Sequence, residues 1–218
     1  MVLDCYIIAD IVQAMLQISD PTYKPERWRG TLLIMATVIV VAAFNILLAS
    51  HLSMCEGLFA TCHFFAFVPV AVALLIMAPK QPPSEVFTHF TDNGGSWPNM
   101  GLTVLVGQVS NMFAVLGCDG IAHLAEEIED CSTVLPRGMV WTYLINAPLT
   151  IVMALVYCFS ITSIPEAVHS TSAFITVFHT AFMDPTPTLA FAAVVLGLIL
   201  MTTISVLASA CRQIFAFA

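Results

Sequence analysis

The sequence predicts an all-α polytopic membrane protein, and three observations support this fold class. Hydrophobic residues make up 59% of the 218 residues and charged residues only 9%, whereas a soluble domain has about 25% charged residues. The apolar residues lie in long runs, each close to the roughly 20 helical residues that cross a bilayer. Prolines, tryptophans and charges gather between these runs, as in loops at a membrane surface. We therefore expect one transmembrane domain over residues 1–218.

Six segments are expected to cross the membrane: residues 2–19, 31–49, 57–78, 101–125, 139–162 and 188–211. The first segment has a stripe of polar side chains at helical spacing, formed by Asp4, Asp10, Gln13 and Gln17. Such a stripe predicts that this helix faces protein or a cavity, and an amphipathic helix lying in the interface is the alternative. A further short helix is expected at residues 173–182.

The fourth segment contains the stretch that indicates function. Gly117 and Gly120 interrupt its apolar run, and Asp119 lies between them. Glycine weakens a helix by about 1 kcal/mol relative to alanine, so the pair predicts a helix break near residues 117–120. A carboxylate inside the bilayer costs at least about 2.5 kcal/mol even on insertion scales, so it faces a cavity or a partner. Broken helices of this kind form binding sites in many transporters, and we expect a solute site here.

Charge and motifs exclude several other classes of protein. A net charge of −8 with only six Lys and Arg residues argues against nucleic-acid binding. None of the seven cysteines forms a C-x-x-C pair, so neither a zinc site nor a disulfide framework is expected. No phosphate loop or dinucleotide motif occurs, and Glu127 stands where the second histidine of H-x-x-E-H belongs. We expect no enzyme activity, no cofactor and no metal.

The stretch GCDGIAHLAEEIEDCSTVLPRGMVW, residues 117–141, resembles the fungal GABA, choline and amino-acid permeases of the amino acid–polyamine–organocation superfamily. Their pattern there is close to G-x-D-x-x-x-H-x-x-E-E-x-x-[DN]-x-S-x-x-x-P-R-x-[ML]-x-W. YKPERWRGTLL, EVFTHFTDNGGSWPNMGLTVLVGQ and ASACRQIFAFA are similar to the same family, so the resemblance covers nearly the whole chain. It implies a leucine-transporter-type fold of twelve helices with two inverted repeats, of which the six segments resemble spans three to eight.

The resemblance implies a secondary, proton-coupled permease for amino acids or related amines such as GABA or choline-like solutes. It would lie in the plasma membrane, with the vacuolar membrane as the alternative, and its partners would be an amine-bearing solute and membrane lipid. The family's first span, which completes the solute site, has no counterpart among the six segments, so we expect a truncated permease whose site needs missing spans or another chain. The alternative is a non-transporting, degenerate or partner-binding fragment. Glu129 and Thr133 favour it because relatives carry basic residues there.

The resemblance also assigns the substrate-binding residues. Asp119 matches the acidic position after the family's unwound sixth span, and Phe113 matches the aromatic position that closes over substrate. With Gly117, Cys118 and Gly120, they form the expected substrate-binding set. Two structural alternatives stay open: a carboxylate satisfied by backbone N–H groups at Asp119, and core packing at Phe113.

Two histidines are candidates for proton coupling. His123 lies four residues after Asp119, so a helix would place the two side chains on one face. Such a pair suits proton coupling, or the two groups neutralise each other without a role in transport. His63 is the titratable side chain of the third predicted segment, at a level where some relatives carry a basic group in place of sodium. The alternative is a histidine that is only hydrogen-bonded.

Glu126, Glu127 and Arg137 match the family's cytoplasmic loop between spans six and seven. They are either a gate latch that breaks and re-forms in each cycle or a solvated acidic loop, since exposed ion pairs contribute only about 0–1 kcal/mol. The family orientation places four basic residues outside and two inside, against the positive-inside tendency. The outside group is Lys24, Arg27, Arg29 and Lys80, and the inside group is Arg137 and Arg212.

Overall fold

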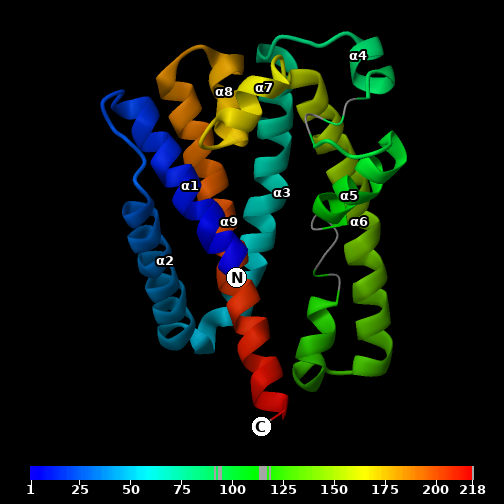
Figure 1. The fold of residues 1–218 in the computed structure, drawn as a ribbon. Helices are drawn as coiled ribbons and strands as arrows, with labels where there is room; N and C mark the ends of the chain where they lie inside the picture. Colours follow the sequence, from blue (N-terminus) through cyan, green and yellow to red (C-terminus); the bar gives the residue numbers. More distant parts are fainter. Residues whose placement is uncertain (91, 93–94, 113–116, 118, 218) are drawn as a thin grey trace. The chain divides into compact units, whose positions relative to one another are not determined.

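The computed structural model describes residues 1–90, 92, 95–112, 117 and 119–217. All regular secondary structure in these residues is helical, which confirms the all-α class (Figure 1). The chain divides into two compact units. Unit 1 comprises residues 1–80 and 160–211, and unit 2 comprises residues 81–159 and 212–218. Whether the two units form one transmembrane domain, as expected, stays a prediction.

Within the described residues, five helices are long and apolar enough to cross a membrane. They are α1 (Val2–Ser19), α2 (Arg27–Leu47), α3 (Leu52–Met77) with the short helix η1 (Ala49–His51) before it, α6 (Cys131–Ser160) and α9 (Pro185–Phe217). This confirms a polytopic membrane protein. The fourth expected segment, residues 101–125, is not among them and contains α5 (Met100–Met112) and the 3-10 helix η3 (Gly120–Glu127).

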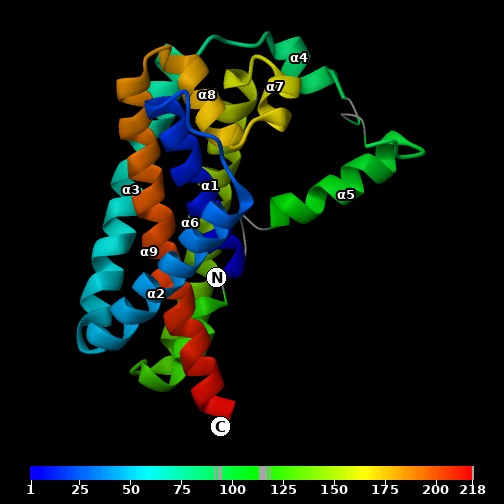
Figure 2. The ribbon, with the colours of Figure 1, turned by 60° about the vertical axis from the view of Figure 1, so that its left-hand side comes forward.

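Unit 1 is built around α1, α2, α3 and α9, with α1 packed along α2 (Figures 1 and 2). Two apolar clusters join these helices. In the first, α2, α3 and α9 contribute Val41, Leu52, Phe59, Ile204 and Ala208; in the second, α1, α8 and α9 contribute Ile11, Ala14, Ile175 and Ala192. Several of these side chains are small, and small residues let membrane helices approach closely enough for van der Waals contact to hold them together.

The helices α7 (Ile164–His169) and α8 (Ala173–Phe182) pack against each other and belong to the same unit. The side chain of Ser163 caps the start of α7, and Met183 in a left-handed conformation ends α8. Phe174, Phe178 and Phe182 recur at every fourth residue, so they share one face of α8. Their rings, with Phe191 of α9, form an aromatic cluster in which the centroids lie 4.7–5.8 Å apart for neighbouring pairs.

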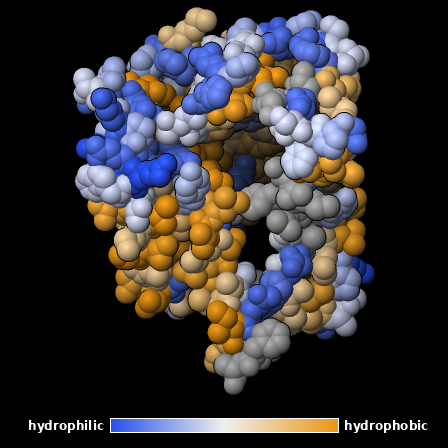
Figure 3. All heavy atoms as spheres, in the orientation of Figure 1, coloured by the Kyte–Doolittle hydropathy of each residue, from blue (hydrophilic) through white to orange (hydrophobic). Residues whose placement is uncertain are grey.

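The outer surface of α2 is apolar, as Figure 3 shows for the face of the molecule drawn there. Leu32, Met35, Ile39 and Val40 are each more than half exposed. Polar residues gather instead over the loop between α1 and α2 (Figure 3). An apolar surface that ends at a polar loop is what the boundary between hydrocarbon and headgroups requires.

Several helices begin earlier than the hydrophobic runs predict. The helix α2 begins at Arg27, directly after Glu26 in an extended conformation, and α3 begins at Leu52, ahead of the expected start at residue 57. The helix α6 begins at Cys131, so Pro136 lies inside the helix and not in its first turn. Residues 128–130 are thus all that separate η3 from α6.

Unit 2 contains α4 (Pro83–Thr88), α5, η3 and most of α6. The start of this unit is tied to the end of α6, because Gln81 N–H donates to Phe159 O at 2.9 Å. The Phe87 and Phe159 rings also meet edge to face, with centroids 5.9 Å apart.

Candidate functional site

The helix break expected near residues 117–120 is confirmed by the backbone of unit 2. The helix α5 ends at Met112, and Gly117 has a φ of 93°, a conformation that residues with a Cβ atom rarely adopt. The N–H of Gly120 donates to Gly117 O at 3.0 Å, and the N–H of Ala122 donates to Asp119 O at 2.8 Å. These bonds form a turn that leads into η3, so the chain changes direction where the glycines stand.

The three residues of the break that the structure describes are not sealed in a core. Gly117 and Asp119 are exposed and Gly120 is half-buried. A Cβ atom on either glycine would meet no other atom within 4 Å. Packing therefore does not require glycine at these two positions. At Gly117 the backbone conformation requires it.

Asp119, His123 and Gln213 form a chain of polar contacts within unit 2. The Nε2 atom of His123 lies 3.4 Å from Asp119 Oδ2. The Gln213 amide donates to Nδ1 of the same ring at 2.8 Å, and its nitrogen also lies 3.1 Å from Nε2. The consistent assignment places the ring proton on Nε2, facing the carboxylate, and leaves Nδ1 as acceptor. The fold therefore brings an acid, an imidazole and an amide together.

The solvent exposure of these side chains determines what they can do. The Asp119 side chain is 62% exposed and the His123 side chain 27%, so their attraction adds little to stability. Asp119 is the N-cap residue of η3 but makes no side-chain capping hydrogen bond. Its carboxylate therefore has free acceptor capacity for an ammonium group, while His123 provides a neighbouring group that can take up a proton.

The other predicted site residues are described in part. Phe113 and Cys118 lie outside the described residues, as do the side chains of Glu126 and Glu127. Arg137 is exposed on α6 and not in a connecting loop. The gate latch stays a prediction.

His63 belongs to unit 1 and has partners of its own. Its Nδ1–H donates to Phe59 O at 2.8 Å, and its Nε2 lies 3.1 Å from Thr202 Oγ1 of α9. Glu56 is also inside α3, because this helix begins before the expected segment does. The helix α3 therefore contains Glu56 as well as His63.

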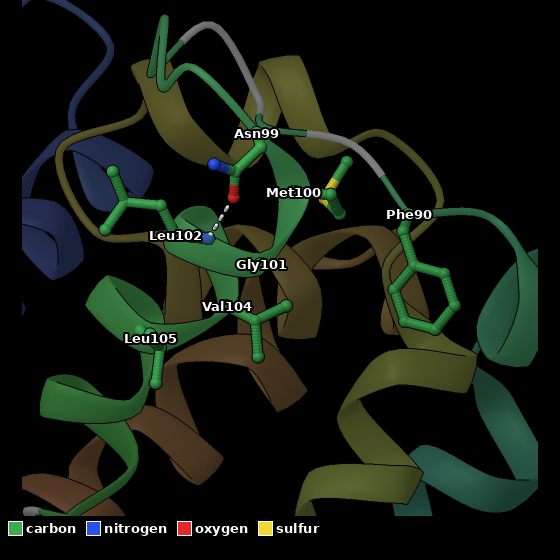
Figure 4. A pocket seen from close by; sticks show the side chains of 7 residues that line it. All are labelled: Phe90, Asn99, Met100, Gly101, Leu102, Val104 and Leu105. Atoms are coloured by element: carbon green, nitrogen blue, oxygen red, sulfur yellow. Dashed lines mark hydrogen bonds between the residues drawn. The ribbon is translucent and has the colours of Figure 1, made fainter.

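Unit 2 has a hollow of about 830 Å³ beside the start of α5 (Figure 4). Its lining is almost wholly apolar: Phe90, Asn99, Met100, Gly101, Leu102, Val104 and Leu105. The one polar side chain, Asn99, caps the helix by accepting from Leu102 N–H at 2.8 Å. Because that oxygen is already engaged and none of the described lining residues is charged, these residues do not suit an amine.

Unit 1 has a hollow of about 890 Å³ between the end of α1 and the α7–α8 pair. Glu166, His169 and His179 are among its lining residues, and all three are exposed. Sequence reasoning pointed to none of them, because Glu166 and His169 lie in α7 and His179 lies in α8, two short helices without a motif.

Two further polar residues, Gln213 and Glu56, were also missed. Gln213 contacts His123 from a position 90 residues away, and no local pattern indicates such a contact. Glu56 carried a readable signal, a lone carboxylate next to a long apolar run, which becomes informative once the helix is known to begin at Leu52.

Comparison with known proteins identifies the family. The chain matches the family described as amino acid permease over residues 2–218. A Macrophomina phaseolina protein provisionally named an amino acid/polyamine transporter is 26% identical over 219 residues, 98% of this chain and 47% of that protein. An uncharacterized amino-acid permease of Schizosaccharomyces pombe is 22% identical over 83% of this chain and 32% of its own length. A swainsonine transporter of Arthroderma benhamiae is 24% identical over 58% of this chain and 25% of its length.

The chain thus spans less than half the length of these relatives. No solved structure shows a significant match to it. The family match nevertheless extends over almost every residue, and the apolar helices are those of a multi-pass membrane protein. The chain belongs to the amino acid permease family.

Proposed function

We propose that this chain is part of a secondary transporter for amino acids or related amine-bearing solutes, and that the break at residues 117–120 lines the solute path. The observation that supports this most is the exposed Asp119 at a broken helix in a chain of the amino acid permease family. A broken membrane helix presents free backbone groups as well as a side chain to a solute. No bond is made or broken in such a cycle, so the chain is a carrier and not an enzyme.

In this proposal Asp119 binds the ammonium group of the solute. His123 Nε2 lies 3.4 Å from this carboxylate, and the Gln213 amide lies within hydrogen-bond distance of both ring nitrogens. An arriving ammonium group competes with His123 for the carboxylate, which links solute binding to the protonation of the ring. Phe113 and Cys118, in the same stretch, would contact the solute.

Proton coupling, the kind of membrane and the solute are parts of this proposal. We propose the plasma membrane, with the vacuolar membrane as the alternative. Amino acids are the first solutes to test, followed by GABA, choline-like amines and polyamines, because one relative is named for amino acids and polyamines. Because the chain spans less than half of its relatives' length, further spans or another chain would complete the site.

The test is solute uptake, driven by a pH gradient, by liposomes that hold this chain joined to the remaining spans of a full-length relative, because the proposed site needs further spans. We expect accumulation of a radiolabelled amino acid or GABA, and at least a tenfold loss with Asp119→Asn, which removes the charge and keeps the shape. The matched control is Asp130→Asn at an exposed aspartate with a φ of 51°, a conformation that asparagine tolerates well. Equal uptake by the two variants would remove Asp119 from the site.

The second candidate function is a membrane protein that associates with partners and does not transport. Two observations favour it: the chain covers only part of its relatives, and Glu129 and Thr133 stand where the resembling permeases carry basic residues. No accumulation of any tested amine, by protein shown to be inserted and folded in the liposomes, would support this candidate and contradict transport by the chain.

A further inference from the structure

Two titratable side chains of α3 are paired with two hydroxyl groups of α9 inside unit 1. Ser205 Oγ donates to Glu56 Oε2 at 2.8 Å, and Thr202 Oγ1 lies 3.1 Å from His63 Nε2. Glu56 and His63 lie seven positions apart, so they share one face of α3. We call these four residues the α3–α9 seam.

Each hydroxyl of the seam has a second acceptor on its own helix. Thr202 Oγ1 lies 3.1 Å from Leu198 O, and Ser205 Oγ lies 3.2 Å from Met201 O. A hydroxyl has one proton to donate and two lone pairs that accept. It can therefore donate to α3, or accept from α3 while its own proton turns to the carbonyl group of α9.

This geometry accommodates both protonation states of each titratable group. Ionised Glu56 accepts from Ser205; protonated Glu56 donates to Ser205, whose proton then goes to Met201 O. Nδ1–H of His63 is fixed by Phe59 O at 2.8 Å, so Nε2 is the atom that gains or loses a proton. When Nε2 is protonated it donates to Thr202, and when it is not, it accepts. In every state the bond between the helices is kept.

Within the described residues, the apolar parts of the helices packed against α3 give these groups no fixed counter-ion. Both lie within a candidate membrane span, Ala49–Met77, about 10 and 20 Å from its start at 1.5 Å per residue. The neighbouring helices carry no Lys or Arg between Thr31 and Leu47 of α2, in α8, or between Pro185 and Cys211 of α9. The other titratable side chains within these ranges, in η1 and on α3 are His51, Cys55, Cys62, His179 and Cys211.

We propose that Glu56 is an intramembrane proton-binding group whose proton is held against the hydroxyl of Ser205. The second pair of the seam contains His63, which the family resemblance already makes a candidate for proton coupling, and Thr202. Ionisable side chains inside a membrane are costly and mark ion or proton pathways, and Glu56 has a partner suited to both of its states. The inference rests on the proposed transport function only for what the proton drives, since proton binding is measured without any solute.

The test is pH-difference infrared spectroscopy of the whole 218-residue chain in liposomes, which detects the C=O stretch of a protonated carboxyl group. We expect a carboxyl band that is lost in Glu56→Gln and shifted in Ser205→Ala, because the band depends on the hydrogen bond. Ser205→Thr keeps the hydroxyl and should keep the band. Glu166→Gln, at an exposed carboxylate of the same unit, is the control that leaves the band unchanged.

For His63, nitrogen NMR of the imidazole ring across the same pH range should show protonation at Nε2 with Nδ1 protonated throughout. Thr202→Val should change the Nε2 signal and leave Nδ1 unaffected. A carboxyl band that survives Glu56→Gln, or one that ignores Ser205→Ala in a correctly folded chain, would overturn the proposal. A titrating seam in a chain that moves no solute would instead refute the transport function and leave the proton site standing.

Discussion

The two units differ in how much of their surface they bury. Among the described residues, Val156 is the only buried hydrophobic residue of unit 2, and every buried polar residue lies in unit 1. Unit 1 adds hydrogen bonds between its helices, such as Asn45 Nδ2 donating to Ile204 O at 3.2 Å. Unit 2 contains the helix break, and α6 exposes Val140, Trp141, Tyr143 and Leu144 in almost unbroken sequence.

This difference in burial suggests that unit 1 is the stable part of the fold and that unit 2 contains the solute site. Regions with few buried contacts open at low free energy, and ligand-binding segments are drawn from them. An apolar helix exposed on all sides is covered by lipid or by other helices in a membrane. We therefore expect unit 1 to resist unfolding on its own and the break in unit 2 to depend on what surrounds it.

The largest effect should come from the aromatic cluster of unit 1. Phe178 is fully buried, and its ring lies 4.7 Å from Phe174 and 5.8 Å from Phe182 and Phe191. Removing a buried ring leaves a cavity that costs about 3–5 kcal/mol, so Phe178→Ala should lower the midpoint of thermal unfolding in detergent strongly.

The matched variant in unit 2 is Leu144→Ala, at a side chain that is 53% exposed on α6. Exposed substitutions change stability by about 0.5 kcal/mol or less, so its unfolding midpoint should stay close to that of the unmodified chain. Equal losses in the two variants would show that the two units do not differ as their burial indicates.

The next effect is on helix stability around the break. Replacing glycine by alanine should have opposite effects at Gly117, in the break, and at Gly107, in α5. Gly117→Ala places a Cβ atom at a φ of 93°, which costs about 1–3 kcal/mol. Gly107→Ala, in the exposed interior of α5 with nothing nearby, should stabilise the helix by about 0.5–1 kcal/mol.

Hydrogen exchange of the backbone amides of α5 and η3 measures both changes. Exchange should quicken in η3 with Gly117→Ala and slow in α5 with Gly107→Ala. If Gly117→Ala left the exchange of η3 unchanged, the positive φ of Gly117 would not be what maintains the helix break.

Much of the fold could be predicted because the bilayer restricts the choices. Hydrocarbon requires each spanning segment to satisfy its own backbone groups, so a long apolar run can only be a helix. The observed α1 (Val2–Ser19) and α8 (Ala173–Phe182) coincide with the expected ranges, because polar residues or turns bound both. The glycine pair around Asp119 predicted the break for an equally local reason.

The remaining features depend on contacts that hydropathy does not record. The start of α6 at Cys131 includes a polar turn and Pro136, neither of which looks like a membrane segment. Gln213 reaches His123 across 90 residues, and the pairing of Glu56 with Ser205 spans 149. Such long-range partners follow from how the helices pack, and a single sequence does not show which faces meet.

The smallest effect should come from the loop that follows α1 in unit 1, where stability should depend on pH only slightly. Asp20 follows α1, and its Oδ1 accepts from Thr22 Oγ1 at 2.7 Å and Thr22 N–H at 2.9 Å. These bonds, the one from the Thr22 side chain first, lower the pKa of Asp20 below its ordinary value of about 3.9. Because the folded-state pKa is the lower one, the contribution is complete above about pH 4 and is lost as the pH falls through the folded-state value.

Thr22→Val removes the stronger of the two donors, so the pKa of Asp20 should rise toward its ordinary value. Carbon NMR of the Asp20 carboxyl group during an acid titration measures this change. Ser19→Ala is the control, since that hydroxyl donates to Met15 O at 3.0 Å and not to Asp20. A pKa of Asp20 that rose equally in both variants would mean that the general field at the end of α1, and not the Thr22 hydroxyl, sets its acidity. The pH dependence of this loop would then be a property of the helix end.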